Sequence, residues 1–218
     1  MFRHYVSLGW FCSVALELER IGLREASLPF DWIGTERMET VITLIEDRFE
    51  GFLTYEDLAQ DASDRARYYD TRRDIPFYHD FDAYHPLADQ LPGVRRRYAR
   101  RIERFYRIIK EPTLFIRYLS GDEDLRWIEA NQERILATLR SFHPGNDILY
   151  IADDTLKSDA VELYSVSADE SDTVARHPFD KNERLRGRLC GCEFPEREKI
   201  CGSIRKNSKE KTACARGH

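Results

Sequence analysis

A cysteine that could act as a nucleophile, Cys12, lies where an expected strand over residues 5–8 gives way to an expected helix. Gly9 ends the strand, and apolar residues then recur at helical spacing as far as Ile21. Free N–H groups at the start of a helix favour a thiolate, so this position predicts a lowered pKa for the Cys12 thiol. The backbone N–H groups of Cys12 and Ser13 could also hold an oxyanion. A small, buried structural thiol is the alternative.

A cysteine nucleophile needs a base within hydrogen-bond reach, and His79 is the best candidate among the six histidines. It belongs to an aromatic segment, residues 77–81, where burial would keep the imidazole neutral and able to accept a proton. His85 precedes a proline and resembles a loop residue. A histidine satisfied within the core is the alternative interpretation of His79.

Charged residues could complete such a site. Asp31 stands between two aromatic residues, where a carboxylate needs a hydrogen-bond partner. The carboxyl ends of parallel strands meet at one edge of a sheet, and ligands bind there. That edge would bring Cys12 together with Arg117 and with Asp153 or Asp154.

The elements that must position these residues alternate between strand and helix. This pattern predicts an α/β fold with a short, mainly parallel sheet flanked by helices in three layers. After Ile151 and a last weak strand the apolar periodicity stops. We therefore expect one domain over residues 1–168 and a loosely ordered tail over residues 169–218. The expected strands cover residues 5–8, 113–119, 147–152 and 163–166, and helices are expected over residues 35–52, from Pro92 to about residue 110, and over residues 122–144.

The composition excludes several classes of function. The 218 residues carry a net charge of −5, so no global basic field favours nucleic acid. No apolar run is long enough to cross a membrane and no leader precedes the first strand, which predicts a cytoplasmic location. The five cysteines form no zinc-binding C-x₂-C pair, and no P-loop or dinucleotide fingerprint occurs. We therefore expect neither a metal nor a cofactor, and the oligomeric state stays open.

The helix expected after Pro92 carries many arginines and few acids. A solvated helix face is one interpretation of this run. The other is a surface that binds phosphate or another polyanion, for which Arg97, Arg101 and Arg104 would flank the buried stripe.

Five motifs in one order resemble the bacterial family described as "putative papain-like cysteine peptidases", a domain of unknown function. The resemblance covers about residues 2–151 and implies Cys12 as nucleophile, His79 as base and Asp31 as the third member. Asp80, Asp153 and Asp154 are the alternatives for that third role. The motifs are Ser-Leu-Gly-Trp-Phe-Cys at residues 7–12, Ser-Leu-Pro-Phe-Asp-Trp-Ile at 27–33, Phe-Tyr-His-Asp-Phe at 77–81, Arg-Arg-Ile-Glu-Arg-Phe at 100–105 and Leu-Phe-Ile-Arg at 114–117.

Together these observations predict a cysteine hydrolase that acts on the carbonyl of a peptide, amide or ester, with Ser13, Trp32 and Arg117 contacting the substrate. The strand before the cysteine is also similar to three-layer α/β esterases and to acetyltransferases that bind coenzyme A. Acyl transfer with coenzyme A is therefore a second hypothesis, and a non-catalytic binding module is the third.

Overall fold

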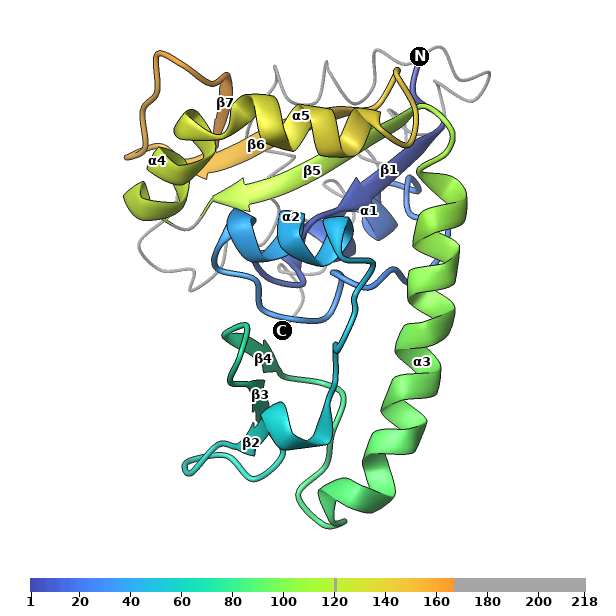
Figure 1. The fold of residues 1–218 in the computed structure, drawn as a ribbon. Helices are drawn as coiled ribbons and strands as arrows, with labels where there is room; N and C mark the ends of the chain where they lie inside the picture. Colours follow the sequence, from blue (N-terminus) through green and yellow to red (C-terminus); the bar gives the residue numbers. More distant parts are fainter. Residues whose placement is uncertain (120, 167–218) are drawn as a thin grey trace, which may run out of the picture.

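The protein is described here by a computed structural model, which places residues 1–119 and 121–166. The described elements are β1 (His4–Ser7), α1 (Ser13–Arg20), α2 (Met38–Glu46), the short 3₁₀ helix η1 (Tyr55–Asp57), β2 (Leu58–Gln60), β3 (Tyr68–Asp70), β4 (Ile75–Phe77), α3 (Leu87–Ile108), β5 (Thr113–Leu119), α4 (Asp122–Ala130), α5 (Gln132–Arg140), β6 (Asp147–Asp153) and β7 (Leu163–Val166). Four of the strands form a wholly parallel sheet in the order β1-β5-β6-β7. A smaller antiparallel sheet, β2-β3-β4, lies apart from it (Figure 1).

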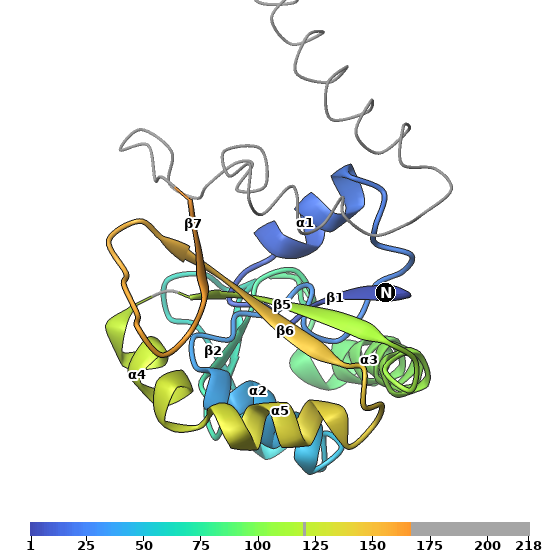
Figure 2. The ribbon, with the colours of Figure 1, turned by 90° about the horizontal axis from the view of Figure 1, so that it is seen from above.

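The parallel sheet is the middle of three layers. Helix α1 covers one of its faces, and α2, α4 and α5 cover the other (Figure 2). Side chains alternate between the two faces along each strand. In β5, Leu114 and Ile116 pack with α1, whereas Phe115 and Leu119 join the larger core on the opposite face. The predicted α/β class, with its parallel sheet between helices, is confirmed.

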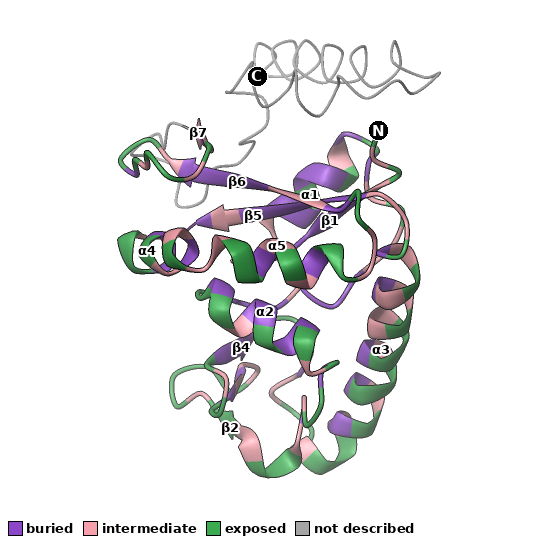
Figure 3. Cartoon of the chain, turned by 45° about the horizontal axis from the view of Figure 1, so that its top comes forward, coloured by how far each residue is buried: buried purple, intermediate pink, exposed green. Residues whose placement is uncertain are grey.

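Helix α3 joins the two sheets. It runs from the end of the small sheet to the parallel sheet along one side of the molecule (Figure 1). Its inner stripe, which includes Val94, Tyr98 and Phe105, is buried, while much of the rest of the helix is exposed (Figure 3). The apolar spacing of α3 therefore builds a single core that reaches from the parallel sheet to the antiparallel one.

Three local predictions are wrong. Residues 54–73 are polar with mixed charges, which predicts a loop or a short helix, yet they contain β2 and β3, which are only three residues long and too short for an alternating pattern to stand out. Helix α3 begins at Leu87 rather than at Pro92, because Pro86 provides the start and Pro92 is tolerated within the helix. The single helix expected over residues 122–144 is two helices, separated at Asn131, whose φ of −123° is not helical.

None of the helices in the described part of the chain is long and apolar enough to cross a membrane. The tail predicted from Asp169, with its four cysteines, lies outside the described residues.

Candidate functional site

The turn before Cys12 is strained. β1 ends at Ser7, and Gly9 and Trp10 then adopt positive φ angles of 81° and 74°. Positive φ is unusual for a bulky residue such as Trp10, and such strain persists only where the surroundings hold it. The Trp10 indole stacks on Tyr118 with ring centroids 5.2 Å apart. This turn places Cys12 at the N-cap of α1, directly before Ser13, the first residue of the helix.

Thr35 holds that turn from the other side. Its Oγ1 accepts a hydrogen bond of 3.1 Å from the Trp10 N–H, and its own N–H donates to the Trp10 carbonyl at 3.2 Å. The hydroxyl also donates to the Leu8 carbonyl at 3.4 Å. A Cβ atom added at Gly9 would lie 2.4 Å from Thr35 Oγ1, so only glycine fits there. From the sequence Thr35 is expected only to begin a helix, whereas α2 begins at Met38 and Thr35 holds the turn instead.

Arg117 anchors Thr35 and the start of α2. Its side chain is fully buried, and its Nη1 donates to Thr35 Oγ1 at 3.0 Å. Its Nη2 donates to the Glu36 carbonyl and to Asp124 Oδ2, both at 2.9 Å. The second oxygen of Asp124 accepts the Met38 N–H at 2.6 Å and so caps α2. Burial lowers the pKa of Arg117, and the Asp124 carboxylate opposes that change.

Arg117 is predicted from the sequence to contact the substrate, but its side chain has no exposed surface from which to do so. A guanidinium without exposed surface, whose bonds go to Leu8, Thr35, Glu36 and Asp124, acts on the site through the loops that it holds.

The loop that contains Asp31 is tied to the strand that precedes His79. The Gly34 N–H donates to the Pro76 carbonyl at 3.0 Å, and Ile33 forms an antiparallel bridge with Phe77. A Cβ atom at Gly34 would lie 2.5 Å from the Pro76 ring, so this contact also depends on glycine.

The segments that carry Cys12 and His79 are also neighbours. Phe11, next to Cys12, makes an edge contact with the ring of Tyr78, next to His79, with centroids 5.7 Å apart. Three motifs far apart in the sequence, at residues 7–12, 27–35 and 76–79, therefore meet at one place beyond the carboxyl end of β1.

His79 is exposed, so the prediction that it is buried is wrong. Its ring makes a T-shaped contact with Trp32, with ring centroids 6.1 Å apart and an interplanar angle of 87°. The ring centroids of His79 and Tyr78 are 6.4 Å apart. Tyr78 and Trp32 are themselves only partly buried, which leaves the imidazole open to solvent. Within residues 1–119 and 121–166 the ring makes no hydrogen bond.

Asp31 contacts a guanidinium rather than an imidazole. Its Oδ2 accepts the Arg24 Nε–H at 3.0 Å and the Leu28 N–H at 2.9 Å. Burial raises the pKa of Asp31, and the Leu28 N–H and Arg24 oppose the rise. Arg24 in turn lies over Trp32, 5.2 Å from the ring centroid. Asp31 is thus connected to His79 through Arg24 and Trp32.

The alternative carboxylates also have other partners. Asp80 accepts the Tyr98 hydroxyl at 2.7 Å, and Asp153 accepts the Thr155 N–H at 2.9 Å. Asp154, beyond the end of β6, is exposed. In the described part of the chain, no carboxylate bonds the imidazole of His79.

The Cys12 thiol is half-buried at the start of α1, and Ser13 is the first residue of that helix. Burial raises the pKa of the Cys12 thiol, and its own backbone N–H opposes the rise. The predicted lowering is therefore wrong for the free protein, because desolvation outweighs the favourable end of a helix of only eight residues.

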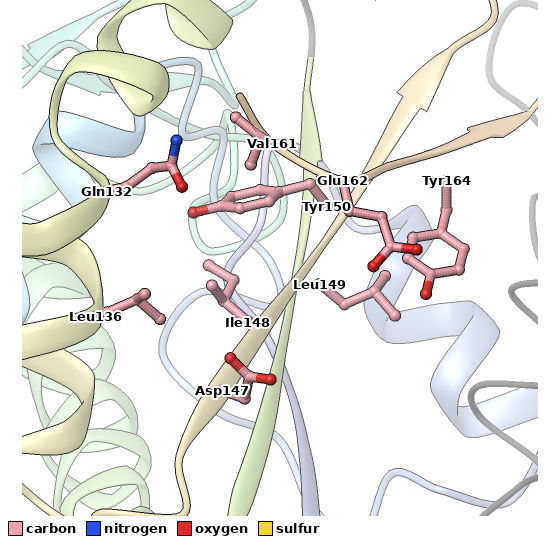
Figure 4. Close-up of a pocket in the computed structure, with 9 residues that line it drawn as sticks. All are labelled: Gln132, Leu136, Asp147, Ile148, Leu149, Tyr150, Val161, Glu162 and Tyr164. Atoms are coloured by element: carbon pink, nitrogen blue, oxygen red, sulfur yellow. The ribbon is translucent and has the colours of Figure 1, made fainter. Parts of the chain in front are cut away.

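A cavity of about 140 Å³ lies elsewhere, between α5 and the strands β6 and β7 (Figure 4). Leu136, Ile148 and Val161 provide much of its apolar lining, and Asp147 and Glu162 its charges. It contains none of the predicted site residues.

Comparison with known proteins places the chain in a family. A family model with the description "Putative papain-like cysteine peptidase (DUF1796)" matches residues 3–142. The chain belongs to this family. An uncharacterized protein, R408 of Acanthamoeba polyphaga mimivirus, is 26% identical over 121 residues, which cover 47% of this chain and 54% of the viral protein. The chain thus spans about half the length of that relative. No solved structure matches the chain.

Proposed function

We propose that the protein is a cysteine-nucleophile hydrolase that acts on the carbonyl of a peptide, amide or ester, with Cys12 and His79 as the catalytic pair. The observation that carries the proposal is the meeting of the Cys12 turn with the His79 segment through Phe11 and Tyr78. The family description names the same class of chemistry.

In this mechanism Cys12 Sγ forms a bond to the carbonyl carbon while its proton passes to a nitrogen of His79. The N–H groups of Cys12 and Ser13, at the open end of α1, stabilise the negative oxygen of the tetrahedral intermediate. The carbon–nitrogen or carbon–oxygen bond then breaks, and His79 returns the proton to the leaving amine or alcohol. Water, deprotonated by His79, releases the acyl group from Cys12 as an acid.

The raised pKa of the Cys12 thiol favours a mechanism in which deprotonation and attack occur together. A resting thiol needs a base that can approach it, and the ring of His79 is exposed and makes no hydrogen bond within residues 1–119 and 121–166. Asp31 supports that ring indirectly, because it holds Arg24 over the ring of Trp32, which contacts His79.

The test is turnover of p-nitrophenyl acetate and of a peptide p-nitroanilide by the full chain and by matched variants. We expect Cys12→Ala to abolish turnover and His79→Gln to lower kcat/KM by about 10²–10⁴-fold, the usual contribution of a general base. The control is His85→Gln, an exposed histidine paired with Asp82, which should leave turnover unchanged. Equal activity in the Cys12→Ala variant would contradict the proposal. A folded wild-type protein that turns over neither substrate would favour a binding module.

A further inference from the structure

Two arginines of α3, Arg97 and Arg101, face the residue that follows His79. Arg97 Nη2 donates to the Asp80 carbonyl at 2.9 Å and lies 3.5 Å from its Oδ1. Arg101 Nη1 lies 3.7 Å from the same Oδ1. The other oxygen of Asp80 is taken by the Tyr98 hydroxyl. One carboxylate therefore faces two guanidiniums.

The hydrogen-bonding capacity of this pair is largely unused. A guanidinium has five N–H donors, yet Arg101 donates no hydrogen bond within residues 1–119 and 121–166. Its Nη1 is buried there without a hydrogen-bond acceptor. Arg97 uses only Nη2, and its side chain is 41% exposed. A buried charged donor without an acceptor is costly, and a bound anion would supply the acceptor.

The carboxylates near Arg97 and Arg101 do not neutralise both guanidiniums. Asp31 is close enough for the charge of Arg101 to act on it, but its hydrogen bonds go to Arg24 and Leu28. Arg24 is itself satisfied by Asp31, Glu19 and Ser27. Unlike Arg24, therefore, Arg97 and Arg101 have N–H donors that no acceptor in the described residues uses.

The surplus charge lies beside the proposed site. Asp80 directly follows His79 in the chain, and Trp32 contacts both His79 and Arg24. A substrate whose carbonyl lies between Cys12 and His79 would extend one of its groups toward α3.

We propose that Arg97 and Arg101 form a subsite for an anionic group, a carboxylate or a phosphate, on the substrate that acylates Cys12. Two guanidiniums one helical turn apart can bind two oxygens of such a group. That the anion belongs to a substrate rests on the proposed function. The anion site itself can be tested without turnover.

The first test compares alkylation of Cys12 by iodoacetate, which is anionic, with alkylation by iodoacetamide, which is neutral. The variant is Arg97→Gln/Arg101→Gln, and the matched control is Arg100→Gln, an exposed arginine of the same helix. We expect the ratio of the iodoacetate rate to the iodoacetamide rate to fall at least about fivefold in the double variant, since one unit charge at contact distance in water has about that effect and two charges are removed, and to stay constant in the control. The use of a ratio cancels any change in the reactivity of the thiol.

The second test is the change in melting temperature on addition of inorganic phosphate or succinate, measured on the same proteins. It does not depend on the reactivity of Cys12, so it decides the question even where Cys12 is not labelled or no substrate is turned over. We expect one of the anions to raise the Tm of wild type and of Arg100→Gln by the same amount, and to raise it less in the double variant. A response to phosphate alone indicates a phosphate-bearing acyl donor, as acyl transfer would use, and a response to succinate alone indicates a carboxylate on the substrate.

Circular dichroism first establishes that the double variant is folded, and Arg97→Gln alone replaces it if it is not. The inference is overturned if the single or double variant keeps both the wild-type alkylation ratio and the wild-type response to both anions. A loss of turnover in Cys12→Ala together with an unchanged anion response would uphold the catalytic pair and reject the subsite.

Discussion

Substitution of Gly9 by alanine tests the packing that holds the turn before Cys12. Gly9 and Gly22 have nearly the same positive φ, 81° and 76°. A Cβ atom at Gly22 meets nothing within 4 Å, whereas at Gly9 it would lie 2.4 Å from Thr35 Oγ1. Gly22→Ala therefore measures the backbone cost alone, and Gly9→Ala measures the same cost plus the contact with Thr35.

The backbone cost of a left-handed residue with a Cβ atom is about 1–2 kcal/mol. Thr35 cannot move without weakening its bonds with Trp10, Leu8 and Arg117, each of which contributes about 1 kcal/mol, and more where the donor is charged. We therefore expect Gly22→Ala to lower the free energy of unfolding by about 1–2 kcal/mol and Gly9→Ala to lower it by about 3–5 kcal/mol.

The assay is equilibrium unfolding in urea, followed by circular dichroism and by tryptophan fluorescence. A third variant, Thr35→Ala, removes the atom that the new methyl group would strike, so Gly9→Ala should cost less in that background than in wild type. Equal losses for Gly9→Ala and Gly22→Ala would refute the account of the turn. So would perfect additivity with Thr35→Ala.

The remaining predictions concern the buried ion pair, the thiol and the core. Arg117→Met should lower the free energy of unfolding by about 3–5 kcal/mol, because it leaves the Asp124 carboxylate buried without its cation. The double variant Arg117→Met/Asp124→Leu should lose less than the sum of the two single losses. Additive losses in urea unfolding would contradict this coupling. Alkylation of Cys12 by iodoacetamide should rise with pH through a midpoint above that of free cysteine, because burial raises the pKa of the thiol and disfavours the reactive thiolate; a midpoint below that of free cysteine would show that the helix end dominates. Phe49→Ala should cost about 3–5 kcal/mol in the same unfolding assay, because its buried ring packs against Phe30, Phe52 and Phe105, and a loss below that of a surface substitution would contradict this packing.

The parallel sheet could be predicted from the sequence because its strands are continuous apolar runs. Six of the seven residues of 113–119, and all of residues 149–152, are buried, so these strands are covered on both faces as inner parallel strands are. The antiparallel sheet could not be predicted, since each of its strands is only three residues long, and their burial differs from the largely exposed β2 to the fully buried β4. Asn131 interrupts an otherwise continuous helical pattern, and its side chain bonds the Trp127 carbonyl.

The candidate site could be predicted as a set of residues but not as a set of contacts. Cys12 stands out by its place after a strand and a glycine, and His79 by elimination among six histidines. The bonds that hold the turn join residues as far apart as Leu8 and Arg117, and nothing in the local pattern of Thr35 or Asp124 indicates them. The exposure of His79 and the burial of Arg117 likewise depend on packing across the whole fold.

The central claim is that Cys12 accepts an acyl group with the help of His79. Its most direct test is mass spectrometry of the protein after brief exposure to p-nitrophenyl acetate and quenching in acid. The account predicts one added acetyl group, located on the peptide that contains Cys12, removed by hydroxylamine and formed much more slowly in His79→Gln than in His85→Gln. An acetyl group on another residue, or one that forms on Cys12 at the same rate in both histidine variants, would contradict it.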